Sequence, residues 1–253
     1  MVDEDDLYPR RKDDRKRQMF DSSDARKAVE NVLDDDTMDA LLKAADRDLI
    51  NKMYGIIESG KESAILLADT KEGLAAVKIY MKRAGAFREM YHYLKGDKRF
   101  RNVKNDRRAI IDAWAKKEFK NLKKASNVVR CPELYGLQEN VLVMEFIGEN
   151  FSPYPKLKDV NIENPETALD QTLNKMKNLW EEEKLVHGDL SEYNILVESD
   201  KLVWIDFSQG VHKTHPEAEQ LLKRDVKNIV NFFNSQGANR DIEKALNVVF
   251  SAS

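Results

Sequence analysis

The feature that most constrains this chain is a polar turn between two apolar runs in its last third. The runs are ILV at residues 195–197 and LVWI at 202–205, and the turn between them is ESDK at 198–201. Short apolar runs joined by such a turn predict a buried β-hairpin. Asp189 stands before the first run and Asp206 after the second. The predicted hairpin therefore presents acids at both ends.

The spacing of the polar residues around this hairpin suits phosphoryl transfer. His187, Asp189 and Asn194, followed by Asp206, have the pattern H-x-D-x-x-x-x-N and D-F-x of the catalytic and metal loops in the protein-kinase fold. One carboxylate orients the nucleophile, while a second carboxylate and an amide oxygen hold the metal ions that bridge the phosphates. Each residue alone is more often an ordinary turn residue. Their joint spacing favours the kinase interpretation.

Two stretches carry a more specific resemblance. Residues 186–196, VHGDLSEYNIL, resemble the catalytic loop of the RIO family of atypical kinases, and residues 205–209, IDFSQ, resemble its metal loop. The two stretches are called the catalytic loop and the metal loop below. The resemblance extends over roughly residues 45–235 and is closer to the first RIO subfamily, as an archaeal-type member, than to the second.

The resemblance implies an α+β fold with two lobes, like that of protein kinases. The N-lobe would be an antiparallel sheet with helices, and the C-lobe would be mainly helical. The expected segments are a charged N-terminal arm at 1–36, partly disordered or solvated, the N-lobe at 37–147, and the C-lobe at 148–253.

The resemblance also implies roles for the site residues. Asp189 would orient the nucleophile, and Asn194 and Asp206 would hold Mg²⁺ or Mn²⁺ bound with ATP. Lys78, in the kinase-like stretch Ala-Val-Lys, would position the phosphates with Glu118 as its partner.

The Lys78–Glu118 pair also follows from helical periodicity. Glu118 falls on the apolar face of a helix predicted over residues 109–124. A buried carboxylate without a partner is costly, so Glu118 needs a cation. Without such a partner, a lysine that alternates with apolar neighbours in a strand more often points to solvent.

A strand-turn-strand unit is predicted around residues 55–68 as a phosphate cover. Its sequence nearly matches a Walker A loop, but a Walker loop leads into a helix, whereas an apolar β run follows here. The expected nucleotide contacts are Ser59, the Gly60 amide, Lys61 and Ser63.

The strand at 141–147 resembles the entry to a kinase hinge, with Met144, Glu145 and Ile147 beside adenine. Its alternative is an edge strand that ends in a loop. Asp225 resembles a family acid that braces the catalytic loop, with ordinary surface exposure as its alternative. Helices are predicted from an N-cap at Thr37, and over 166–184, 221–233 and 241–250.

Residues 82–108, called the basic segment below, carry ten Lys or Arg against three acids. Aromatic residues interleave these charges. Such a segment is either a solvated, mobile insertion or an RNA-binding surface, in which phosphates supply affinity and bases stack on aromatic rings.

Composition excludes several classes of protein. Charged residues make up 34% of the chain, hydrophobic ones 42%, and the net charge is −3, so neither DNA nor a membrane is an expected partner. The lone Cys131 excludes an internal disulfide. With no signal-like N-terminus, the sequence predicts a cytoplasmic protein.

The predicted function is that of a serine/threonine kinase with ATPase activity. The resemblance implies a role in maturing the small ribosomal subunit, with its precursor, as protein and possibly rRNA, as the partner. The alternatives are a small-molecule phosphotransferase of aminoglycoside type and a nucleotide-gated ribosome- or RNA-binding module with little catalysis.

Overall fold

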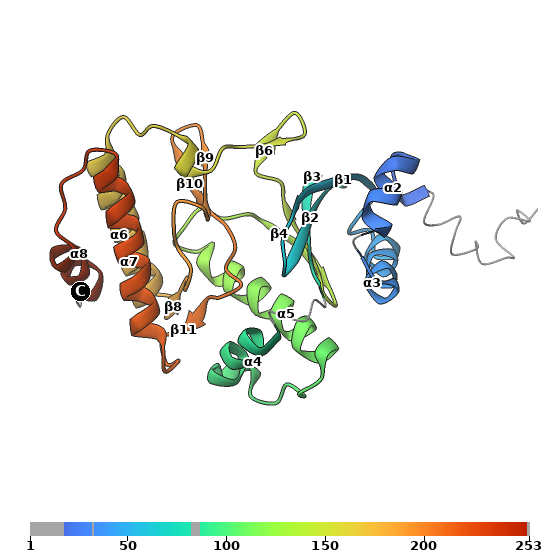
Figure 1. The fold of residues 1–253 in the computed structure, drawn as a ribbon, viewed down its shortest axis with the longest axis horizontal. Coiled ribbons are helices and arrows are strands. Elements are labelled where there is room, and N and C mark those ends of the chain that lie inside the picture. Colours follow the sequence, from blue (N-terminus) through green and yellow to red (C-terminus); the bar gives the residue numbers. More distant parts are fainter. Residues whose placement is uncertain (1–17, 32, 82–86, 252–253) are drawn as a thin grey trace, which may run out of the picture. The chain divides into compact units, whose positions relative to one another are not determined.

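A computed structural model describes residues 18–31, 33–81 and 87–251 of the chain (Figure 1). Residues 1–17 of the expected arm and residues 82–86 of the basic segment lie outside these ranges.

The chain forms two compact units. The N-terminal unit comprises residues 1–81 and 135–145, and the C-terminal unit comprises residues 82–134 and 146–253. The first stretch of the C-terminal unit, residues 82–134, therefore contains the basic segment and the residues directly after it. The expected segment boundaries at 36 and 147 remain predictions.

The N-terminal unit is built on one five-stranded sheet in the order β1-β2-β3-β5-β4. Its central pairs, β1 with β2, β2 with β3 and β3 with β5, are antiparallel. The strands are β1 (Lys52–Ser59), β2 (Ser63–Thr70), β3 (Gly73–Tyr80), β4 (Leu134–Gln138) and β5 (Val141–Glu145). The predicted strand-turn-strand unit is present as β1 and β2, and no helix follows its turn.

Two helices of the N-terminal unit contact this sheet, α2 (Ser23–Glu30) on β1 and α3 (Asp35–Asp46) on β5. Val29 of α2 and Leu41 of α3 are buried in one apolar core with the sheet residue Leu66. The expectation of a solvated arm is therefore wrong for the part from residue 18 onward. The expected N-cap Thr37 is also wrong, because Asp34 caps α3 and accepts a hydrogen bond from the Thr37 N–H at 2.9 Å.

The C-terminal unit is mainly helical. Its helices are α4 (Phe87–Gly96), α5 (Arg107–Ala125), α6 (Pro165–Glu181), α7 (Ala218–Ser235) and α8 (Ile242–Phe250), with short 3₁₀ turns η2 (Lys98–Phe100) and η3 (Leu157–Asp159). Its strand pairs are β6 (Gly148–Glu149) with β7 (Ser152–Pro153), β8 (Leu185–Val186) with β11 (Val211–His212), and β9 (Ile195–Glu198) with β10 (Lys201–Trp204).

The long helices α6 and α7 and the shorter α8 pack on one another (Figure 1). Leu173 and Met176 of α6 and Ile229 of α7 are fully or almost fully buried. The buried residues Leu169, Leu173 and Met176 of α6 are spaced three or four residues apart and form the apolar stripe that the sequence predicted. This packing fixes α7, which carries Asp225 toward the catalytic loop.

The described part of the basic segment is folded and packs on α5. Met90, Leu94 and Phe100 are buried, and the Tyr93 ring lies edge-on to Trp114 at 6.0 Å. The expectation of a mobile insertion is therefore wrong for residues 87–108. Tyr93 and Phe100 are used in packing, which leaves them less available for stacking on bases.

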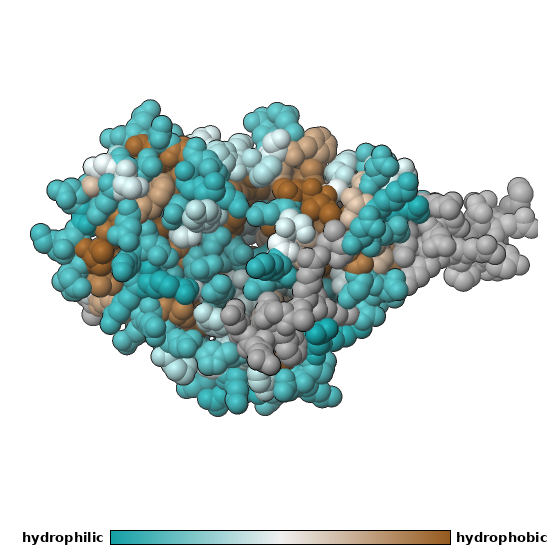
Figure 2. Space-filling model, in the orientation of Figure 1, coloured by the Kyte–Doolittle hydropathy of each residue, from teal (hydrophilic) through white to brown (hydrophobic). Residues whose placement is uncertain are grey.

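Hydrophilic residues predominate on the face of the molecule shown in Figure 2. Among the described residues, none of the helices combines the length and the apolar character that a membrane crossing requires.

Candidate functional site

The catalytic loop runs from β8 into β9 and depends on a glycine. Gly188 has φ +80°, and a Cβ there would lie 2.8 Å from the Gln209 carbonyl oxygen. A larger residue would therefore strain the backbone and also collide with the metal loop. Gly188 is therefore required because the backbones of the catalytic loop and the metal loop approach each other closely at this point.

One buried carboxylate on α7 braces this loop. The N–H groups of Gly188 and Leu190 donate to the two carboxylate oxygens of Asp225, at 2.8 and 3.1 Å. Asp225 has no exposed surface. The surface alternative is thus wrong, and the bracing geometry predicted for Asp225 is present. Burial raises the pKa of Asp225 to about 8, although the two N–H donors and Arg224 favour its ionised form.

Asp189 lies at the end of the braced segment and is about half exposed. Asn194 donates from its amide nitrogen to the Asp189 carbonyl oxygen at 2.8 Å and to its carboxylate at 3.3 Å. Burial raises the pKa of Asp189, Asp206 adds to this effect, and Arg224, 3.8 Å away, opposes it. The structure therefore brings together Asp189 and Asn194 as predicted.

The metal loop directly follows β10. Its second residue, Asp206, has a left-handed backbone conformation with φ +59°. The Ser208 hydroxyl donates to Asp206 Oδ1 at 2.6 Å, and the Ser208 N–H donates to the same oxygen at 3.3 Å. Ser208 replaces the glycine of the ordinary D-F-G motif. Its side chain therefore holds one oxygen of the Asp206 carboxylate in place.

Hydrogen bonds tie the two loops together at the base of the hairpin. His187 Nε2 lies 3.0 Å from the Ile205 carbonyl oxygen, and the Ile205 N–H donates to the Asn194 carbonyl oxygen at 3.0 Å. The His187 ring also packs on Phe207, with ring centroids 4.4 Å apart. Contacts within the C-terminal unit therefore hold the two loops together.

The donor atoms of these loops fit a hard cation. The amide nitrogen of Asn194 is committed to Asp189, which leaves its oxygen as the available ligand beside the Asp206 carboxylate. Magnesium prefers oxygen ligands and is often held by one or two carboxylates together with substrate phosphates. Among the described residues no group of three or more His, Cys, Asp or Glu could hold a metal by itself. A magnesium ion shared with a nucleotide matches this donor set.

The remaining predicted residues lie mostly in the N-terminal unit. Lys78 is 3% exposed in β3, and its ammonium lies 5.3 Å from the Tyr80 ring. The alternative that Lys78 points to solvent is therefore wrong. Glu118, on α5 of the C-terminal unit, is fully buried. Since the two residues belong to different units, their pairing remains a prediction.

The predicted phosphate cover is the turn between β1 and β2. Ser59 ends β1, Ser63 begins β2, and Lys61 is exposed between them. The Gly60 N–H, expected to face phosphate, donates instead to the Ser63 carbonyl oxygen at 2.9 Å. A phosphate would have to compete with that bond.

The predicted hinge residues are divided between the units. Met144 is buried and Glu145 half-buried at the end of β5. Ile147 lies in the C-terminal unit, in an apolar cluster with Leu196 and Val203 of the catalytic hairpin. The strand expected over 141–147 therefore ends two residues early.

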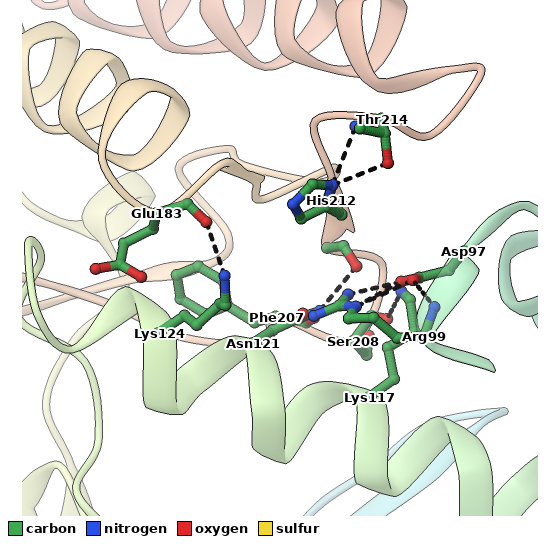
Figure 3. Close-up of polar contacts among 11 residues, drawn as sticks. Asp97, Arg99, Lys117, Asn121, Lys124, Glu183, Phe207, Ser208, His212 and Thr214 are labelled. Carbon is green, nitrogen blue, oxygen red and sulfur yellow. Dashed lines mark hydrogen bonds and ion pairs between the residues drawn. The ribbon is translucent and has the colours of Figure 1, made fainter.

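Sequence reasoning missed three polar residues that reach these loops. Arg224 donates to the Gly188 carbonyl oxygen, and Lys117 and Asn121 of α5 donate to carbonyl oxygens of the metal loop (Figure 3). A Lys and an Asn four residues apart on a helix ordinarily indicate a solvent face. The sequence did offer one indication. Ala113, Trp114 and Leu122 surround Lys117 and Asn121 on the helix surface with apolar side chains, which predicts a buried face.

Comparison with known proteins gives consistent matches. The sequence pattern that defines the RIO domain matches residues 64–245. The RIO-type serine/threonine-protein kinase Rio1 of Haloferax volcanii is 41% identical over 244 residues, covering 94% of this chain and 84% of its own. The enzyme of the same name from Methanocaldococcus jannaschii is 44% identical over 207 residues, which cover 82% of this chain and 71% of that enzyme.

The solved structure of the Rio2 kinase–ADP/Mg²⁺–phosphoaspartate complex from Chaetomium thermophilum has a similar fold. Its TM-score is 0.61 at 22% sequence identity, with 84% of this chain and 66% of that chain covered. The predicted α+β fold of the kinase type is thereby confirmed.

The raised pKa of Asp225 predicts a pH dependence of stability. An unfolded Asp titrates near about 4, and the folded pKa is about 8, so the folded state binds an extra proton between these values. The contribution of this group is full below the unfolded pKa and is lost as pH rises toward the folded one. Asp225→Asn removes the titration, so the free energy of unfolding of wild type relative to the variant should fall with rising pH.

Urea unfolding from pH 4.5 to 8 measures this difference. Glu219→Gln, at an exposed acid of the same helix, is the matched control and should track wild type at every pH. Parallel pH profiles for wild type and Asp225→Asn would mean that Asp225 is ionised throughout this window.

Proposed function

The chain belongs to the RIO family of atypical protein kinases, and on this premise we propose that it transfers the γ-phosphate of ATP to a serine hydroxyl or to water. The observation that carries the proposal is the junction of the two loops, where Asp189, Asn194 and Asp206 meet at the base of one hairpin. Family membership favours this reaction over a small-molecule phosphotransferase.

Asp189 is the proposed general base. Its carboxylate would accept the proton of the attacking hydroxyl while the hydroxyl oxygen forms a bond to the γ-phosphorus. The bond from that phosphorus to the β–γ bridging oxygen breaks, and ADP leaves. Because its pKa is raised, Asp189 is a stronger proton acceptor than an ordinary aspartate. The nearby Arg224 favours its ionised form, which is the form that can accept a proton.

Asn194 and Asp206 are the proposed ligands of Mg²⁺ or Mn²⁺, which would neutralise charge on the phosphates when bound. Ser208 fixes one oxygen of Asp206 and so orients the other. In the N-terminal unit we assign phosphate contacts to Ser59, Gly60, Lys61 and Ser63, and phosphate positioning to Lys78 with Glu118. Adenine would lie beside Met144, Glu145 and Ile147.

Replacing Asp189 by Ala tests the proposed function. ATP turnover and autophosphorylation should fall by about 10²–10⁴-fold because the base is lost, while ATP affinity stays within a few fold because Asp189 contacts the nucleophile. Turnover is measured as phosphate release and affinity by calorimetry. Glu192→Ala, in the same loop, is the control and should retain both. Wild-type turnover in Asp189→Ala would remove the base assignment.

A double-mutant cycle tests Lys78 and Glu118 as a pair. Lys78→Met and Glu118→Gln should each lower kcat/KM, and the double variant should lose much less than the product of the two factors, because each residue needs the other. If the loss of kcat/KM in the double variant equals the product of the two single losses, Glu118 does not have its proposed role.

The short connection after the metal loop bears on the substrate. Only residues 213–217 separate β11 from α7, so little chain remains to build a platform on which a peptide could dock. We therefore propose that the main reaction is ATP hydrolysis stimulated by precursors of the small ribosomal subunit. In this route an oxygen of Asp206 attacks the γ-phosphorus and ADP leaves. Water, whose proton Asp189 accepts, then hydrolyses the aspartyl phosphate, releasing phosphate and restoring the carboxylate.

Turnover with and without purified precursor particles tests this route. We expect stimulation of about tenfold or more, and a hydroxylamine-sensitive phosphate on the protein. An equal mass of unrelated folded RNA is the control for charge alone. No stimulation, with efficient phosphorylation of a generic protein, would identify a conventional serine kinase instead.

A further inference from the structure

Helix α5 presents a row of hydrogen-bond donors to the backbone beneath the site (Figure 3). Lys117 donates to the Ser208 carbonyl oxygen at 2.6 Å. Asn121, one turn later, donates to the carbonyl oxygens of Phe207 at 3.0 Å and Gly210 at 2.7 Å. The two side chains therefore satisfy carbonyl groups within and directly after the metal loop.

Lys117 is an unusual residue for this position because it has no exposed surface. Its amine lies 4.5 Å from the Trp114 ring centroid and 5.7 Å from that of Tyr93. Burial lowers the pKa of Lys117 well below its usual value, and the carboxylates of Asp97 and Asp206 oppose this effect. Burying an amine is costly, and an apolar residue of the same shape would fill the space without that cost. The polar end of Lys117 therefore needs another explanation, and its short bond to Ser208 supplies one.

That bond acts on the residue that holds Asp206. The side chain and N–H of Ser208 donate to the Asp206 carboxylate, while the Ser208 carbonyl oxygen accepts the hydrogen bond from Lys117. Asp206 itself has a left-handed backbone, which the surroundings must maintain. The direction of the carboxylate is thus set by a chain of contacts that begins on α5.

We propose that Lys117 is a positioning residue for the metal loop. Lys117 holds Ser208 in place, so that the Asp206 carboxylate points to its cation. This inference rests on the proposed function, because it takes Asp206 as a metal ligand. Groups that orient metal ligands typically change metal affinity or activity by about 10–100-fold when removed.

The basic segment supplies part of the surroundings of Lys117. Asp97 is buried, and Arg99 holds its carboxylate with hydrogen bonds from the guanidinium at 2.6–3.1 Å. Asp97 in turn attracts the Lys117 amine, whereas Arg99 repels it. The basic segment thus supplies charged groups that act on the positioning residue in both directions.

Lys117→Met tests the proposal, since Met keeps the length and the apolar contacts but donates no hydrogen bond. Lys116→Met, at the neighbouring exposed lysine of α5, is the matched control. The first readout is hydrogen–deuterium exchange of a peptide spanning residues 205–212 without nucleotide, which is independent of activity. Exchange should accelerate in Lys117→Met and stay unchanged in Lys116→Met.

The second readout is the Mg²⁺ concentration that gives half-maximal ATP turnover. It should rise about tenfold in Lys117→Met, with a melting temperature close to that of wild type, and remain unchanged in Lys116→Met. Unchanged exchange, or faster exchange with an unchanged Mg²⁺ requirement, would overturn the proposal. If Lys117→Met does not fold, Lys117→Gln takes its place; its shorter side chain should weaken the bond to Ser208 and raise the Mg²⁺ requirement above that of Lys116→Met, and an unchanged requirement would overturn the proposal.

A wild-type protein without Mg²⁺-dependent turnover would instead refute the proposed function. The exchange experiment would then still report whether Lys117 holds the loop.

Discussion

The buried carboxylate of Asp225 is the contact on which the geometry of the site depends. It accepts the N–H groups of Gly188 and Leu190, on either side of Asp189, from a helix fixed by the packing of α6, α7 and α8. Without Asp225, two buried donors would lose their partners, at a cost of about 1–3 kcal/mol each. The position of Asp189 is therefore set by the helical core of the C-terminal unit.

The sequence was sufficient to predict the elements whose patterns are local. The apolar runs around 198–201 form the hairpin β9–β10, and the helix predicted over 109–124 is α5. The spacing of Asp189, Asn194 and Asp206 could be read because short loops at a hairpin bring such residues together. The hairpin and the helix needed only periodicity and turn chemistry, whereas the three polar residues were found through their match to the kinase loop pattern.

The sequence did not reveal residues whose role depends on tertiary contacts. Lys117 and Asn121 look like a solvent face until the metal loop supplies carbonyl groups for them. Met90 and Leu94 are four residues apart, the spacing of one helix face, but the charges around them favoured a solvated insertion although both are buried. In each case the contacts that bury these residues come from far away in the chain, so the sequence did not show which partners they would have.

Asp189 and Asp225 show how one unit can give two carboxyls different tasks. Burial raises the pKa of both, but Asp189 is half exposed and lies beside Arg224, whereas Asp225 is fully enclosed. Arg224 favours the ionised form of both groups and also donates to the Gly188 carbonyl oxygen. Of the two, only Asp189 retains contact with solvent, as its proposed role as a base requires. Asp225, which faces two N–H donors, holds the backbone on which Asp189 stands and would serve the proposed reaction in that way.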